Sequence, residues 1–199
     1  MNKVLILFAH PRFEQSRANQ ALLEKVKQNP KITFHDLYEA YPDFHIDVPY
    51  EKSLLEAHDV IVWHHPFYWY SCPPLMKQWI DMVLEYGWAY GPGGEALQHK
   101  KCLQVITTGG SRKVYCSQGR NNYTINEFLR PFEQTARLCQ MEYLPPFAVM
   151  GTNKLSATEL DDYAAQYEQI VENLIVDEPL EEIKGCVFEE DIIKLENLN

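Results

Sequence analysis

The chain has 199 residues, 46% of them hydrophobic and 13% aromatic, a composition that excludes disordered and collagen-like proteins. Its longest apolar runs are far shorter than the roughly 20 residues of a membrane-spanning helix, and the N-terminus lacks the pattern of a secretion signal. The net charge is −10, and the excess of acids lies entirely in residues 151–199, which argues against nucleic acid and anionic lipid as partners. The five cysteines are widely spaced without a C-x-x-C pair, so we expect a cytoplasmic protein that binds a small molecule or another protein.

Short apolar runs alternate with amphipathic stretches along the chain. The run at 3–9 is apolar almost throughout, as in a parallel strand that is buried on both faces. Ser156 and Glu159 form a capping-box pattern ahead of a long helical repeat of apolar residues. In chain order, strands are predicted over 3–9, 32–37, 60–64, 102–107 and 143–150, and helices over 16–29, 51–58, 73–86, 124–139 and from 156 on. Because parallel neighbours need helical crossovers, this order predicts an α/β fold with a doubly wound five-stranded parallel sheet in three layers.

The sequence shows no internal repeat, low-complexity tract or linker before about residue 176. We therefore expect one domain over residues 1–176, followed by an acidic C-terminal extension over residues 177–199. The extension mixes apolar residues with acids, and this composition suits a segment that packs on the domain or on a partner.

The loop after the first predicted strand carries residues that could hold a phosphate. In an open α/β sheet, ligands bind beyond the carboxyl ends of the strands, so the loops after the first, third and fourth strands should share one site. After the first strand, the free amides at a helix start, the Ser16 hydroxyl and the Arg17 guanidinium offer donors to an anion. The segment is neither a P-loop nor a G-x-G-x-x-G motif, and an ordinary helix cap with surface residues is the alternative interpretation.

The loops after the third and fourth strands suggest a flat ligand. Four successive aromatic residues stand at 67–70, and residues 63–90 hold 9 of the 25 aromatic residues around one predicted crevice. Aromatic walls suit a planar heterocycle, although a packing cluster or a dimer interface is an alternative. The glycines at 109 and 110 let the backbone approach a ligand closely, or else form a plain turn. Together the three loops describe a site for flavin mononucleotide or a similar cofactor.

Short motifs at these loops match one known family. They are AHP at 9–11, S-x-x-N at 16–19, YPDF at 41–44, HPFYWYSCPPLMKQWID at 65–81, GWAYG at 87–91, TTGG at 107–110 and LPPF at 144–147. On these motifs the chain resembles, from Lys3 to about Ile175, the flavodoxin-like NAD(P)H quinone oxidoreductases. It is most similar to their short bacterial branch, which includes the ancillary subunit of glutathione-gated potassium efflux systems. The resemblance implies that the predicted sheet is flavodoxin-like.

The resemblance also implies a bound flavin, FMN with FAD as the alternative, and assigns residues to it. The phosphate and ribityl chain would be held by His10, Ser16, Arg17, Ala18 and Asn19, the isoalloxazine ring flanked by Phe67, Tyr68, Trp69 and Tyr70, and its polar edge contacted by Thr108, Gly109, Gly110 and Ser111. Tyr115 matches a catalytic tyrosine that assists hydride transfer. Mammalian members carry a histidine where this chain has Asn121, so a Tyr–His relay is not expected.

The implied reaction is a two-electron, ping-pong transfer from NAD(P)H through the flavin to a quinone or a related azo or nitro acceptor. A homodimer is implied as well. The alternative is a regulatory subunit that docks on a membrane potassium antiporter, which would place this cytoplasmic protein at the inner face of the cell membrane. A one-electron carrier ranks last. No metal is expected, and His64 and His65, which adjoin a strand, are expected to be structural.

Overall fold

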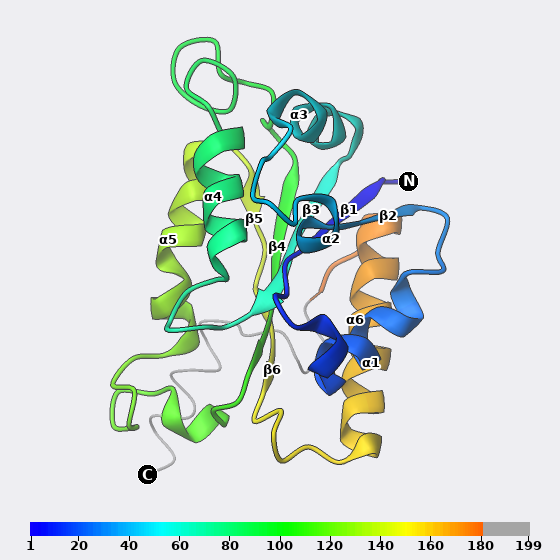
Figure 1. Cartoon of the computed structure of the whole chain (residues 1–199), viewed down its shortest axis with the longest axis vertical. Coiled ribbons are helices and arrows are strands. Elements are labelled where there is room, and N and C mark those ends of the chain that lie inside the picture. The colour runs from blue at the N-terminus through cyan, green and yellow to red at the C-terminus, as the bar shows by residue number, and fades with distance from the viewer. Residues whose placement is uncertain (181–199) are drawn as a thin grey trace.

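A computed structural model describes residues 1–180 of the chain, and at its centre lies a sheet in which all the pairings between strands are parallel (Figure 1). The strands are β1 (Val4–Phe8), β2 (Ile32–Asp36), β3 (Val60–Pro66), β4 (Lys101–Thr108), β5 (Glu142–Tyr143) and β6 (Phe147–Met150). Their order is β2-β1-β3-β4, with β5 and β6 both paired to β4. Because the chain adds β2 on one side of β1 and then β3 and β4 on the other, the sheet is doubly wound, and the predicted α/β class is confirmed.

Helices cover both faces of the sheet and complete the three layers (Figure 1). The elements are α1 (Arg17–Val26), α2 (Leu37–Ala40), α3 (Val48–Ala57), α4 (Pro74–Val83), α5 (Ile125–Leu138) and α6 (Ala157–Val176), with 3-10 turns η1 (Phe13–Gln15) and η2 (Arg112–Val114). Helices α1 and α6 pack against each other on one face. The buried side chains of α2, α3, α4 and α5 belong to the core on the opposite face.

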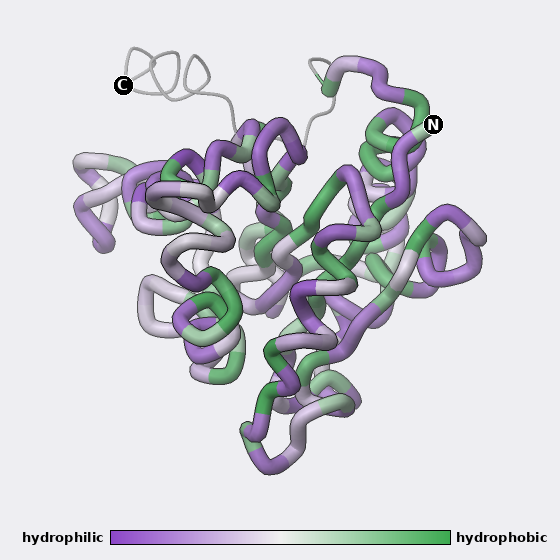
Figure 2. Tube along the Cα trace, turned by 90° about the horizontal axis from the view of Figure 1, so that it is seen from above, coloured by the Kyte–Doolittle hydropathy of each residue, from purple (hydrophilic) through white to green (hydrophobic). Residues whose placement is uncertain are grey.

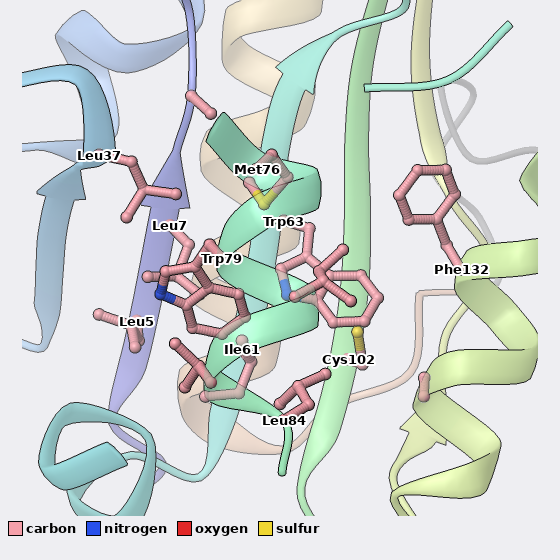
Figure 3. Packing of buried hydrophobic residues seen from close by; sticks show 14 of the residues in the cluster. Leu5, Leu7, Leu37, Ile61, Trp63, Met76, Trp79, Leu84, Cys102 and Phe132 are labelled. Atoms are coloured by element: carbon pink, nitrogen blue, oxygen red, sulfur yellow. The ribbon is translucent and has the colours of Figure 1, made fainter. Parts of the chain in front are cut away.

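The alternation of side chains along β1 explains why this strand is apolar throughout. Leu5 and Leu7 point toward the core under α4, where Trp79 packs among them (Figure 3). Ile6 and Phe8 belong to the second core, under α1 and α6. Along the trace, hydrophobic positions gather in the interior and hydrophilic ones on the outer loops (Figure 2). The sheet is therefore buried on both faces, as a parallel sheet between helices must be.

The predicted fifth strand over 143–150 is found as two segments, β5 and β6. Between them stand Pro145 and Pro146, which have no backbone N–H to donate to a neighbouring strand. Both segments still pair with β4 in parallel register, so the position of the strand in the sheet is as expected.

Other boundaries differ from the predictions by a few residues. The prediction missed α2, because β2 ends at Asp36, whose carboxylate then accepts the amides of Tyr38 and Glu39 as a helix cap. Helix α3 starts earlier than predicted, after a cap at Asp47. The third strand is longer than predicted, since β3 extends through Pro66. The capping box predicted for α6 is confirmed, with the Ser156 hydroxyl accepting the Glu159 amide.

The end of the described chain still contacts the domain. Asp177 accepts hydrogen bonds from the side chains of Lys101 and Asn2, and Leu180 is buried against the α6 side of the sheet. The predicted extension thus begins as part of the fold at 177–180, and its remainder, 181–199, lies outside the described residues. Within residues 1–180, no helix combines the length and apolar character needed to cross a bilayer.

Candidate functional site

A cavity of about 580 Å³ lies among the loops that follow β1, β3, β4 and β6. It therefore occupies the carboxyl end of the sheet, where doubly wound folds bind their ligands. Its size is that of a typical small-molecule site. The cavity is lined by His10, Arg12, Gln15, Ser16, Arg17, Ala18, Pro66, Phe67, Tyr68, Thr107, Gly109, Thr152 and Asn153.

The first turn of α1 supplies backbone donors to this cavity. Ser16 caps the helix, and its hydroxyl accepts the amide of Asn19 at 3.3 Å. The amides of Arg17 and Ala18 belong to the helix start, where no intrahelical acceptor exists, and both residues line the cavity. The positive end of the helix dipole adds to their attraction for an anion.

His10 adds a neutral side-chain donor. The backbone amide of Arg12 donates to His10 Nδ1 over 3.0 Å, so Nδ1 carries no proton and Nε2 holds the N–H. Burial lowers the pKa of His10, against a smaller opposing effect of Glu14, and the ring is therefore neutral at pH 7. His10 can donate one hydrogen bond into the cavity without being charged.

Asn19, expected to contact the cofactor, lies beneath the cavity instead of lining it. Its side chain is buried, and Nδ2 lies 2.8 Å from Ser16 Oγ and 3.0 Å from Thr107 Oγ1. Its Oδ1 lies 2.9 Å from His64 Nε2. Asn19 therefore connects the start of α1 to the ends of β3 and β4.

The aromatic loop is split between the cavity and the surface. Phe67 and Tyr68 line the cavity, whereas Trp69 is 94% exposed and Tyr70 packs on Phe128 of α5 with a ring separation of 4.9 Å. Trp69 and Tyr70 have φ of 48° and 63°, and the amides and carbonyls of Tyr68 and Ser71 bond to each other across them. These are the features of a tight two-residue turn, which directs the two middle side chains away from the cavity.

Only Gly109 of the predicted 108–111 segment lines the cavity. A Cβ on Gly110 would lie 2.9 Å from Cε2 of Tyr115, and one on Gly109 would lie 2.9 Å from Nδ2 of Asn153. The glycines thus make room for two neighbouring side chains. Ser111 is the residue before η2 and does not belong to the lining.

Tyr115, the predicted catalytic residue, lies against the cavity wall without lining it. Its ring contacts Phe67 and Phe128 at centroid distances of 5.9 and 6.1 Å. Its hydroxyl lies 2.7 Å from Thr108 Oγ1, which also accepts the amide of Gly110 at 3.2 Å. Asn121 is 3.5 Å from the Tyr70 hydroxyl.

Sequence reasoning missed several lining residues, above all Thr152 and Asn153. They follow β6, and the rule that ligands bind beyond the carboxyl ends of strands applies to the fifth strand as well as to the others. Arg12 and Gln15 stand in the loop that was singled out, but residue type alone did not distinguish them from surface residues. Thr107 is the last-but-one residue of β4, where the predicted strand over 102–107 meets the TTGG loop.

The lining residues fit a phosphate joined to a flat ring. At the α1 end the cavity has backbone amides, two arginines, a hydroxyl and a neutral histidine, and no aspartate or glutamate belongs to the lining. Phosphate oxygens are acceptors, so this set of donors is complementary to them. Phe67 and Tyr68, the latter in edge contact with the His10 ring at a centroid distance of 6.1 Å, provide apolar surface for an aromatic ring. Within residues 1–180, no group of three His, Cys, Asp or Glu side chains could hold a metal ion.

Comparison with known proteins agrees with this geometry. A family model described as flavodoxin-like fold matches residues 2–171. Among curated proteins, the glutathione-regulated potassium-efflux system ancillary protein KefG of Salmonella typhimurium is 47% identical over 171 residues, which cover 86% of this chain and 93% of KefG.

Several solved structures are similar over most of their length. The general stress protein 14 of Treponema denticola, solved in complex with FMN, is 40% identical with a TM-score of 0.83, over 86% of this chain and 99% of that one. A P. pentosaceus protein described as an NADPH-quinone reductase is 30% identical with a TM-score of 0.77, over 84% and 96%. A structure described as a thermophilic tryptophan halogenase is 44% identical with a TM-score of 0.82, over 84% and 97%.

Proposed function

The chain belongs to the family with the flavodoxin-like fold, and from that premise we propose that it is a flavoprotein oxidoreductase, an FMN-dependent NAD(P)H:quinone reductase. The observation that carries the proposal is the cavity, whose lining combines hydrogen-bond donors without any acid and the aromatic rings of Phe67 and Tyr68. Its relatives are described by several different chemistries, so likeness alone does not identify the reaction, whereas the residues of the site bear on it directly.

The phosphate of FMN would be held at the start of α1. The amides of Arg17 and Ala18, the hydroxyl of Ser16 and Nε2–H of His10 are the donors in place, and Arg12 adds a second guanidinium. An FMN complex of a protein 40% identical to this chain supports the choice of FMN. FAD, the alternative drawn from the sequence, has no such support among the relatives described above.

The ring would lie against Phe67 and Tyr68, with the backbone near Gly109 at its polar edge. The polar edge of the ring would be backed by the rest of the same loop, namely Thr108, Gly110 and Ser111. The two-residue turn of Trp69 and Tyr70 would lie outside the ring site. Bound flavin would supply the redox chemistry, by accepting a hydride from NAD(P)H and passing both electrons to a quinone. The role of this chain is to fix the ring and to donate hydrogen bonds to it.

Tyr115 is proposed as the catalytic residue, a hydrogen-bond donor toward the reacting edge of the ring. Its hydroxyl proton is available only when Thr108 donates to Tyr115, because a hydroxyl has one proton. With Asn121 close to Tyr70 instead, the proposal includes no charge relay. Tyr115→Phe is expected to slow flavin reduction about tenfold with the flavin still bound. An unchanged rate of reduction would remove Tyr115 from the mechanism.

An anaerobic visible spectrum tests the function directly. The purified protein, reconstituted with FMN, is titrated first with NADPH or NADH and then with a benzoquinone. A flavin band that bleaches with the nucleotide and returns with the quinone is the expected result. A bound flavin that neither nucleotide reduces would contradict the reductase, and so would a protein that takes up no flavin. The same titration with azo and nitro compounds compares the acceptors.

The second candidate is a regulatory role on a membrane potassium antiporter, with reductase activity secondary. Identity of 47% to a protein described as an efflux-system ancillary subunit favours it. We propose a cytoplasmic homodimer for either role, and in the regulatory case its partner would hold it at the inner face of the membrane. Co-purification of the antiporter from solubilised membranes would support the regulatory role. A reductase that never co-purifies with a membrane protein would contradict the regulatory role and leave only the enzymatic one.

A further inference from the structure

Asn19 contacts two hydroxyls of the cavity lining from the buried side of α1. It is 1% exposed and lies on the first turn of α1. Its Nδ2 reaches Ser16 Oγ at 2.8 Å and Thr107 Oγ1 at 3.0 Å, and both of those residues line the cavity. Whether Asn19 donates to these hydroxyls or accepts from them decides what they can offer a ligand.

His64 decides the orientation of the Asn19 amide. It is fully buried between the rings of Phe8 and Tyr167, at centroid distances of 5.2 and 5.3 Å, and burial holds its pKa well below the usual value. The neutral ring has one N–H. Within the described chain Nδ1 has no partner, while Nε2 lies 2.9 Å from Asn19 Oδ1.

The proton therefore belongs on Nε2 of His64. If it were on Nδ1, a buried N–H would be left without an acceptor, at a cost of roughly 1–3 kcal/mol. With the proton on Nε2, His64 donates to Oδ1 of Asn19, and the NH₂ group of Asn19 must face Ser16 and Thr107. The contacts of the Asn19 amide in the structure agree with this assignment.

Donation from Asn19 leaves the two hydroxyls with protons to spare. A hydroxyl has one proton and two acceptor positions. Ser16 Oγ accepts from the backbone amide of Asn19 at 3.3 Å as well as from Nδ2, so both of its acceptor positions are taken. Thr107 Oγ1 also accepts from Nδ2. A ligand at the cavity would find these oxygens as hydrogen-bond donors.

We propose that Asn19, held by His64, is a positioning residue that turns the Ser16 and Thr107 hydroxyls into donors and thereby selects a phosphomonoester ligand. The inference rests on the proposed function, since it concerns how the cavity would recognise the FMN phosphate. It predicts that the preference for FMN over riboflavin, which lacks the phosphate, comes in large part from a residue that does not touch the ligand.

The test compares FMN and riboflavin binding, followed by flavin fluorescence, for Asn19→Asp. The aspartate has the same shape but only accepts, so Ser16 and Thr107 must turn their protons to it. Each lost hydrogen bond to a charged group is worth about tenfold or more, and we expect a loss of roughly 100-fold in FMN affinity. Riboflavin affinity is expected to stay within about threefold. Equal losses for both flavins would mean a general disruption of the cavity and would overturn the proposal.

Asn19→Asp also adds a negative charge near the phosphate, and a double variant without the two hydroxyls separates this effect from the turning of the hydroxyls. In Ser16→Ala/Thr107→Val there are no hydroxyls to turn, so Asn19→Asp should cost less than about tenfold there. The same cost in both backgrounds would overturn the proposal. Should Asn19→Asp fail to fold, FMN binding to Ser16→Ala/Thr107→Val alone tests the proposal. Binding as tight as in the wild type would show that the hydroxyls donate nothing to FMN and would overturn it.

The wild-type protein distinguishes this inference from the function on which it rests. Binding of FMN no tighter than riboflavin would overturn the selection of the phosphate while leaving a flavin site. Binding of neither flavin would overturn the proposed function, and the inference with it.

Discussion

Two regions of the molecule gather hydrogen-bond donors around the place of a negative charge, and in only one of them does the chain supply that charge. On α3, the carboxylate of Glu51 is fully buried and accepts from the Tyr41 hydroxyl at 2.5 Å, His35 Nε2 at 2.6 Å and the Trp79 indole at 2.7 Å. At the start of α1, Ser16 and its neighbours present donors to an open cavity that contains no acid.

The difference separates what stabilises the fold from what binds a ligand. The Glu51 cluster joins β2, the segment after α2, and α4, and all its donors are satisfied within the chain. Burial, and then the hydrogen bond to Glu51, raise the pKa of Tyr41, which keeps its proton in this network. The α1 end of the cavity needs an anion from outside. Changes in the first region should cost unfolding free energy, and changes in the second should cost affinity.

The largest effect is expected for Glu51→Gln. The amide keeps the shape but removes the charge, and if its oxygen stays with Tyr41 and His35 its NH₂ group faces the Trp79 indole, which only donates. Breaking a buried charged network costs about 3 kcal/mol or more of unfolding free energy. Urea denaturation measures it, with the exposed Glu24→Gln as the matched control, expected within about 0.5 kcal/mol of the wild type. If Glu51→Gln were as stable as the control, the cluster would not be a stabilising element.

The next largest effect is expected from acid, which should lower the free energy of unfolding by protonating the buried His65. Its Nδ1 bonds to the Pro66 carbonyl, and its Nε2 lies 2.9 Å from Nε2 of Gln104. Burial lowers its pKa from 6.5 to about 4, so the unfolded chain binds the proton first and stability falls as the pH drops below 6.5. The loss attributable to His65 should reach about 2 kcal/mol by pH 5.

The check is the unfolding free energy of the wild type and of His65→Gln at pH 7 and pH 5. The variant is less stable at pH 7, but it should lose less than the wild type on acidification. Parallel losses in the two proteins would mean that His65 does not cause the acid sensitivity.

The donors at the start of α1 are tested by Arg17→Met, which removes an exposed guanidinium from the cavity lining. We expect roughly a tenfold to thirtyfold loss of FMN affinity, the value of one hydrogen bond to a charged group, and stability within about 0.5 kcal/mol of the wild type. Arg137→Met, on α5, is the control and should change neither quantity beyond that range. A variant that loses stability but retains its FMN affinity would reverse the proposed division between the regions.

The smallest effect is expected for Trp69→Gly. The tryptophan is 94% exposed and its φ of 48° is unfavourable for a side chain, so glycine relieves strain of about 1 kcal/mol and loses little contact. FMN affinity should remain within about twofold of the wild type, while Phe67→Ala, at the wall itself, should lose much more. A large loss of FMN affinity in Trp69→Gly would show that Trp69 contacts the flavin ring after all.

The contrast between the two regions was only partly visible in the sequence. Apolar runs and the capping box predicted the strands and α6, because these patterns follow directly from burial on two faces or one. Nothing in the sequence marks Glu51, since a glutamate on a helix is normally solvated and its three partners come from other segments of the chain. The motif S-x-x-N is equally compatible with Asn19 facing a ligand or facing its own chain, and only its burial decides. The direction of Trp69 depends on two positive φ angles that its residue type does not suggest.

Pro145 and Pro146 also affect how the molecule behaves among its neighbours. The outer edge of a sheet offers free amides and carbonyls to any extended peptide, and such pairing is a common start of aggregation. Here the edge beside β4 consists of a two-residue and a four-residue piece, separated by two residues that have no N–H. All four residues of β6 are buried, and the proline pair separates β6 from β5. A passing strand therefore could not form a continuous ladder along this edge of the described sheet, which protects the protein against association in a crowded solution.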